Sequence, residues 1–216
     1  MRNTYKNSLV IAITGGIGSG QSTVSSYFQQ WQCKVINADL KAKEVIRKNK
    51  ALQSELKKAF GNSIFTANGK LDNARLAAIA FSNEIKTQKL NQLVHPHMVE
   101  SLVEDMEKAR FSGRYPLIII DAALIFEISI EQMFDGIIVV DAPLKERMMR
   151  VKERDNMTQR QFKERADKQI PLSDKVKWAD FVINNDDSLE VLKSRSRKVL
   201  NELLKMQKKS AQRKAN

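Results

Sequence analysis

The sequence predicts an α/β fold in which a five-stranded parallel sheet is flanked by helices. Apolar runs of strand length recur along the chain, and the first of them is followed by a glycine-rich turn and then by a helical pattern. Strands that alternate with helical patterns form βαβ units, whose strands run parallel and are covered by helices. The fold class therefore depends on two observations, the alternation of elements and the place of the glycine turn.

Each expected strand is a short apolar run that ends at glycine, asparagine or an acid. After the glycine turn, apolar residues recur at the spacing of a helix that packs on a sheet, from Val24 to Trp31. The last helix is expected from Leu189 to about Met206. The five expected strands are residues 8–14, 34–36, 117–120, 136–140 and 181–183.

The chain reads as a single domain, residues 1–216, with a helical insertion and a lid. Polar, helix-forming sequence with a turn at 61–69 and an expected break at Pro96 separates the second strand from the third. The basic segment after Met206 has almost no apolar residue and is expected to fray. The expected parts are a core (8–38, 115–142 and 179–206), a helical substrate subdomain (about 40–112), a lid (about 144–172) and a basic tail (207–216).

Composition excludes several classes of protein. Of the 216 residues, 42% are hydrophobic, which is enough for a core, and no internal repeat is present. The one cysteine, Cys33, excludes a disulfide scaffold and is read as a buried apolar group rather than a reactive thiol. The apolar run at 8–14 is too short to span a membrane, so a cytoplasmic protein without a membrane partner is expected. The net charge of +12 comes mostly from the segment 193–216, and alone it allows an anionic ligand, nucleic acid or simple solubility.

The glycine turn has the spacing of a phosphate-binding loop, G-x-x-x-x-G-K-[ST], with Gln21 in the place of lysine. Small residues let consecutive backbone N–H groups curl around a polyphosphate, and the following helix adds the positive end of its dipole. The Ser22 hydroxyl stands where it would bind Mg²⁺. A dinucleotide-binding G-x-G-x-x-G does not fit the spacing, and a glycine turn without a ligand is the remaining alternative. The residues of this loop are Gly15, Gly16, Ile17, Gly18, Ser19, Gly20, Gln21, Ser22 and Thr23.

Over roughly residues 8–192 the chain resembles the dephospho-coenzyme A kinase family. The resemblance is carried by the order and spacing of short segments, which besides the loop include residues 37–39, 68–72, 80–83, 93–96, 123–127, 150–155, 169 and 179–185. It implies a P-loop kinase fold with a helical substrate subdomain and a lid. It also implies transfer of the γ-phosphoryl group of ATP to the ribose 3′-hydroxyl of dephospho-coenzyme A, with Mg²⁺.

The resemblance also implies roles for individual residues. Asp39 would be the catalytic acid that receives the hydroxyl proton, although it equally suits the N-cap of a helix beginning at Leu40. Arg150 would stabilise the transition state, Arg154 would add a second cation, and Gln21 would replace the usual lysine. Nucleotide contacts would also come from Asn185, substrate contacts from Arg75, His95, Leu124 and Glu127, and metal contacts from Ser22 and Asp121.

Some of these residues have structural alternatives. Arg147, Arg150 and Arg154 share one helical face, which could also be a solvated surface. His95 could serve packing, and Glu127 could be a helix-start charge. Thr158 and Gln161 form the sequence pattern of a capping box.

Three departures from the family pattern, Gln21, Asn37 and Ala123, fall at or near the expected active site. They leave open a paralogue that binds nucleotide or coenzyme A but transfers phosphate weakly. Another small-molecule P-loop kinase and a binder of nucleic acid or an acidic partner through the basic tail are further alternatives. Nucleic acid is not the expected partner, because few aromatic side chains accompany the basic residues. The oligomeric state, monomer or homo-oligomer, stays open.

Overall fold

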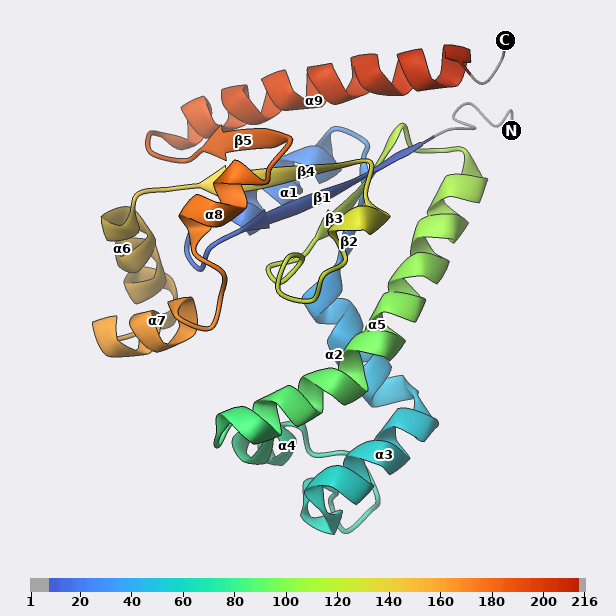
Figure 1. Cartoon of the computed structure of the whole chain (residues 1–216), viewed down its shortest axis with the longest axis vertical. Coiled ribbons are helices and arrows are strands. Elements are labelled where there is room, and N and C mark those ends of the chain that lie inside the picture. Colours follow the sequence, from blue (N-terminus) through green and yellow to red (C-terminus); the bar gives the residue numbers. More distant parts are fainter. Residues whose placement is uncertain (1–7, 214–216) are drawn as a thin grey trace. The chain divides into compact units, whose positions relative to one another are not determined.

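The structure, a computed structural model, describes residues 8–213 and contains a five-stranded sheet (Figure 1). The strand order is β2-β3-β1-β4-β5, and every neighbouring pair is parallel. The predicted α/β fold with a parallel sheet is confirmed. The strands are β1 (Leu9–Gly15), β2 (Lys34–Asn37), β3 (Leu117–Asp121), β4 (Gly136–Asp141) and β5 (Phe181–Asn184).

The burial of the three central strands, β3, β1 and β4, explains why their sequences are continuous apolar runs. Every residue of β1 and β3 is buried, as are all residues of β4 except Asp141. A strand covered by helices on both faces must be apolar on both, so it appears as a continuous apolar run rather than an alternating one. The polar residues come at the strand ends, where Asp121 and Asp141 close β3 and β4.

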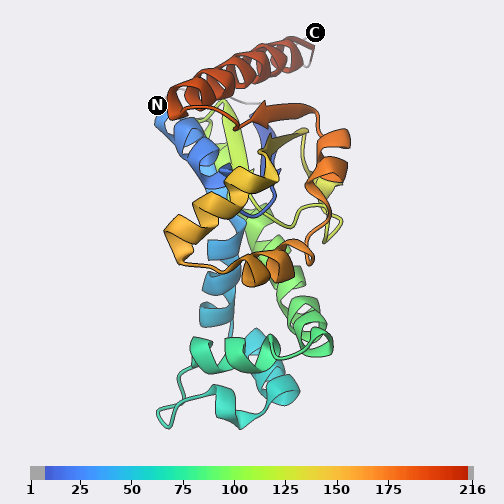
Figure 2. The ribbon, with the colours of Figure 1, turned by 90° about the vertical axis from the view of Figure 1, so that its left-hand side faces the viewer.

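Helices α1 (Gln21–Gln30) and α9 (Leu189–Arg213) pack together against the sheet (Figures 1 and 2). Phe28 of α1 and Leu200 of α9 belong to the same buried cluster as Ile11 of β1. The segment expected to be a lid, about 144–172, contains α6 (Leu144–Asp155) and α7 (Gln159–Ala166), and α8 (Leu172–Lys177) begins at its end. No helix within residues 8–213 combines the length and the apolar character needed to cross a lipid bilayer.

The chain divides into two compact units, one formed by the residues up to Asn37 and from Met106 onward, the other by Ala38–Asp105. The second unit has its own core, which includes Leu52, Leu56 and Val94. The helical subdomain is expected over about 40–112, and the part of α5 from Met106 onward falls in the first unit. This unit contains α2 (Ala38–Lys48), α3 (Lys50–Phe60), the short 3₁₀ helix η1 (Asn62–Ile64), α4 (Asn73–Ala80) and most of α5 (Glu84–Ser112). A second short 3₁₀ helix, η2 (Glu131–Met133), lies in the first unit.

Three local predictions are wrong. Pro96 does not break the helix, because α5 continues through it, and buried Val94 and Met98 on either side supply packing that offsets the lost hydrogen bond. Asp39 is not an N-cap, since α2 begins at Ala38 and places Asp39 inside the first turn, where an acid suits the helix dipole. The last helix does not end near Met206 but continues to Arg213, and Gln207 is buried.

Candidate phosphate-binding site

The loop between β1 and α1 has the backbone that its glycines predict. Gly18 and Gly20 have φ of 79° and 94°, in the left-handed region. A Cβ on Gly18 would lie 2.5 Å from the Arg147 carbonyl oxygen, and a Cβ on Gly20 would clash with Asn185 Nδ2. Side chains are therefore excluded twice, by conformation and by space. A chain that turns this tightly into a helix N-terminus presents backbone N–H groups to an anion.

Three side chains from distant parts of the chain hold this loop. The Ile17 N–H donates to Gln169 Oε1 at 2.9 Å, and the Ile17 carbonyl accepts from Arg147 Nε at 2.9 Å. The Asn185 side-chain amide donates to the Ser19 carbonyl at 2.7 Å. Two of these partners, Gln169 and Arg147, come from the segment 144–172, which therefore holds the backbone of the loop.

Gln21 makes a hydrogen bond to the acid at the end of β3. Its Nε2 donates to Asp121 Oδ1 at 2.5 Å, while Asn37 Nδ2 donates to Asp121 Oδ2 at 3.0 Å. Asp121 is 5% exposed, so its carboxylate lies in a site from which water is largely excluded. Both oxygens thus accept from uncharged amides, and two of the three departures from the family pattern meet at this one carboxylate.

The three lid arginines do not share a solvated face. Arg147 is buried, and Arg150 is half-buried, with Nη2 donating to Glu146 at 2.7 Å and to the Asn185 carbonyl at 2.9 Å. Arg150 Nη1 is buried and has no hydrogen-bond partner within residues 8–213. Arg154 is exposed and pairs with Asp155 at 2.7 Å, a contact that raises the pKa of the guanidinium. Arg150 and Asn185 are thus brought together, whereas Arg154 points to its neighbour.

Glu127 forms a buried ion pair that the sequence does not suggest. Its Oε1 lies 2.6 Å from Lys175 Nζ and accepts from the Ile170 N–H at 3.0 Å. Lys175 also donates to the Ala123 carbonyl at 2.9 Å, and burial lowers the pKa of its ammonium. The pair ties the turn that contains Leu124 to α8, and the bond from the Ile170 N–H ties it to the residues just before that helix.

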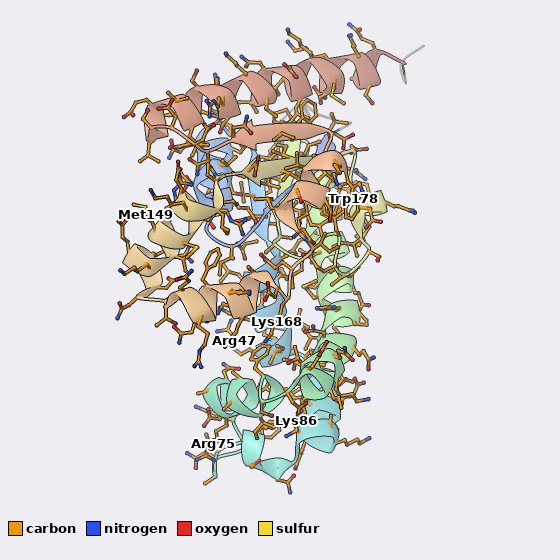
Figure 3. All side chains as sticks on the ribbon, turned by 60° about the vertical axis from the view of Figure 1, so that its left-hand side comes forward. Arg47, Arg75, Lys86, Met149, Lys168 and Trp178 are labelled. Atoms are coloured by element: carbon orange, nitrogen blue, oxygen red, sulfur yellow. The ribbon has the colours of Figure 1, made fainter. Side chains whose placement is uncertain are left out.

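The predicted substrate residues Arg75 and His95 lie in the second compact unit, Ala38–Asp105. Arg75 on α4 is exposed (Figure 3). Its Nε lies 3.2 Å from Asp72 Oδ2. His95 lies in α5, and burial lowers the pKa of its imidazole. The roles of these residues and of Asp39 stay predictions.

Sequence reasoning missed three residues that shape the site. Arg147 stood out only as part of the arginine trio, and Gln169 only as one point of the family resemblance. Lys175 gave no signal, because a lysine among charged and polar residues resembles an exposed helix position.

Comparison with known proteins gives consistent results. The family model described as dephospho-CoA kinase matches residues 9–190. A dephospho-CoA kinase of Bacillus anthracis is 34% identical over 89% of this chain and 96% of its own length. One from Listeria monocytogenes is 37% identical over 83% of this chain and 90% of its own length. A crystal structure from Thermus thermophilus matches with a TM-score of 0.76 and 32% identity, covering 91% of this chain and 98% of the other. A shikimate kinase from Acinetobacter baumannii, 13% identical with a TM-score of 0.52 over 93% of this chain and 95% of its own, shares the fold.

Proposed function

This chain belongs to the dephospho-CoA kinase family, and we propose on that basis that it phosphorylates the ribose 3′-hydroxyl of dephospho-coenzyme A. ATP would supply the γ-phosphoryl group, and the products would be coenzyme A and ADP. The observation that carries the proposal is the loop from Gly15 to Ser22 at the carboxyl end of β1. Ligands of parallel sheets bind at that edge, and the loop lies within the region that the family model matches.

The chain's own residues would bind and orient the triphosphate. Backbone N–H groups of the loop and the N-terminus of α1 would hold the phosphates. Arg150, whose Nη1 is buried without a partner among the described residues, would neutralise charge on the transferring group. Asn185 would hold the loop through its bond to the Ser19 carbonyl, and Arg154 would add a second cation after leaving Asp155.

The acceptor hydroxyl would be deprotonated or oriented by Asp39. Arg75 and His95 would bind the substrate from the helical unit, and Leu124 would offer it an apolar contact. Glu127 would act through Lys175, by holding the turn at Leu124, rather than as a free carboxylate.

Mg²⁺ fits the oxygen atoms at the loop. Ser22 is exposed at the start of α1, and Asp121 ends β3 beside Gln21. A hydroxyl and a carboxylate are ligands that Mg²⁺ accepts, directly or through water, with phosphates completing the shell. When bound, the ion would neutralise charge on the phosphates.

The proposal includes a cytoplasmic location. It is supported by the single cysteine, which is free and buried, as suits a reducing compartment.

Turnover by the purified chain tests the proposal. We expect ADP and coenzyme A to form from ATP, Mg²⁺ and dephospho-coenzyme A, with a fall of at least 10²-fold in kcat for Asp39→Asn. Lys152→Gln, a change at an exposed lid position, serves as the control with unchanged turnover. Mass spectrometry of the product identifies the acceptor. Nucleotide binding without any product would favour the binding-only paralogue, and transfer to another acceptor would favour a different small-molecule kinase.

A further inference from the structure

Arg147 is a buried cation that touches the phosphate-binding loop. Its exposed fraction is 9%, and its Nε donates to the Ile17 carbonyl at 2.9 Å. A Cβ built on Gly16 would lie 2.6 Å from Arg147 Nη2, so the guanidinium lies against the loop backbone. The Phe162 ring of α7 covers the guanidinium, with its centroid 5.6 Å from Cζ. Met149, which lies on the same helix as Arg147, is exposed instead (Figure 3).

The bond to the Ile17 carbonyl sets the direction of the next N–H group. In a planar trans peptide the C=O and the following N–H point in opposite directions. Arg147 draws the Ile17 carbonyl toward itself and so turns the Gly18 N–H away from α6. Within residues 8–213 this N–H has no hydrogen-bond partner. It is therefore available to an anion held inside the loop.

Arg147 also differs from three other cations of the same compact unit in having no carboxylate partner among residues 8–213. Lys175, Arg150 and Arg154 each have a carboxylate oxygen at 2.6–2.7 Å. Within the described part of the chain, no carboxylate lies within 4.0 Å of the Arg147 guanidinium. Burial lowers its pKa, which reflects the cost of keeping this charge away from water, and Asp141 acts in the opposite sense. A positive charge that is desolvated and unpaired gains most when an anion binds nearby.

We propose that Arg147 is a positioning residue that orients the loop for polyphosphate and supplies from behind it the positive charge that Gln21 lacks. The guanidinium acts through the 17–18 peptide and through its electric field, not by replacing a phosphate ligand. Since Gln21 is neutral and already bonded to Asp121, this arrangement lets the loop retain a local cation. The inference depends on the proposed function only in requiring that the loop binds a polyphosphate.

Nucleotide affinity, measured by calorimetry without any acceptor, tests this role. AMP, ADP and a non-hydrolysable ATP analogue, the latter two with Mg²⁺, are compared for wild type, Arg147→Gln, Arg147→Lys and the control Lys152→Gln, which removes an exposed charge from the same helix. We expect Arg147→Gln to weaken binding of the triphosphate at least tenfold, binding of ADP less, and binding of AMP hardly at all, because the electric field of the guanidinium acts on phosphate charge. Arg147→Lys should recover most of that loss, and Lys152→Gln should show none. Equal weakening of all three nucleotides, or equal losses for Arg147→Gln and Arg147→Lys, would overturn the inference, because a purely structural role predicts them.

Gln21→Lys gives a second readout that does not require Arg147→Gln to fold. If Arg147 already supplies the charge, lysine at position 21 should improve triphosphate affinity less than fivefold in the wild-type background. A larger gain there would contradict the inference. Where Arg147→Gln folds, the same lysine should restore more than fivefold. The kinase proposal fails separately, if the chain does not turn over dephospho-coenzyme A although the nucleotide affinities follow this pattern.

Discussion

At the scale of single residues, the Lys175–Glu127 pair shows how strongly burial changes the effect of a charge. Lys175 is fully buried in α8, whereas Lys177 in the same helix is 70% exposed and pairs with Asp174. Removing one partner of a buried pair leaves the other charge without compensation, which costs about 3–5 kcal/mol.

Lys175→Met is therefore expected to lower the free energy of unfolding by about 3–5 kcal/mol, measured by urea denaturation. Lys177→Met should change it by less than about 1 kcal/mol, because exposed pairs contribute little. Adding Glu127→Gln to Lys175→Met should recover part of the loss. Similar effects of the two lysine substitutions would show that the buried pair has no special weight.

Cys33 gives a pH-dependent prediction. The thiol is 4% exposed, and burial raises its pKa from 9.0 to about 12, while Arg197 acts weakly in the opposite sense. An unfolded chain loses this proton near pH 9 and the folded chain near pH 12, so the free energy of unfolding falls as the pH rises between them. The total effect is on the order of 2–4 kcal/mol.

Stability measured from pH 8 to 10.5 should thus fall more steeply for wild type than for Cys33→Ala, which lacks the thiol. The same burial predicts that an alkylating reagent leaves Cys33 intact at pH 8 unless the protein is unfolded. Parallel pH profiles for both proteins, together with fast alkylation, would contradict the account.

The sequence predicted the loop residues because their type and spacing are themselves the signal. Gly18 and Gly20 have positive φ, and Ser22 stands at the start of α1, as expected. Arg147 and Lys175 could not be ranked in this way. Arg147 meets a carbonyl 130 positions away in the chain, and Lys175 one 52 positions away, so only the folded chain shows that either is buried.

At the scale of elements, the capping-box pattern correctly predicted the start of α7, whereas the helix-breaking tendency of proline wrongly predicted an interruption of α5. The Thr158 hydroxyl accepts from the Gln161 N–H at 3.3 Å, while Gln161 Oε1 accepts from the Thr158 N–H at 2.9 Å, which confirms the capping box. This motif needs only neighbours in sequence. The prediction at Pro96 failed because tertiary packing outweighs the local preference of proline.

Thr158→Ala should destabilise α7 by about 1 kcal/mol, since an N-cap bond is lost. Because α7 is short, we expect faster hydrogen exchange of its amides without a comparable change in β1 or β3. Gln159→Ala, one position on and outside the capping box, is the matched control. Unchanged exchange in Thr158→Ala would mean that the cap does not limit opening of α7.

At the scale of the whole molecule, α9 unites a structural role with the basic charge of the chain. Leu192, Leu200 and Leu203 of this helix are buried in the main core, and Ser196 between them is buried too. The helix is thus part of the fold, although its charge pattern alone left a binding function open. The order of elements predicted the sheet, whereas the length of α9 depended on contacts made near its end, such as the burial of Gln207.

A chain that ends at Gln207 should keep its melting temperature within about 3 °C, because it retains all three leucines. A chain that ends at Leu192 should not fold cooperatively, since it loses two of them, at about 2–5 kcal/mol each. Calorimetric melting distinguishes the two. A stable chain ending at Leu192 would show that α9 is an appendage.

The most direct test of the whole account is calorimetric titration of the purified chain with ATP and Mg²⁺, beside Gly18→Val. A Cβ at position 18 meets the Arg147 carbonyl at 2.5 Å in a backbone with φ of 79°, so valine must disrupt the loop. We predict saturable binding by wild type, with a dissociation constant well below 1 mM, and none by Gly18→Val. No binding of ATP by folded wild type at millimolar concentration, or equal binding by both proteins, would contradict the claim that this loop holds the nucleotide.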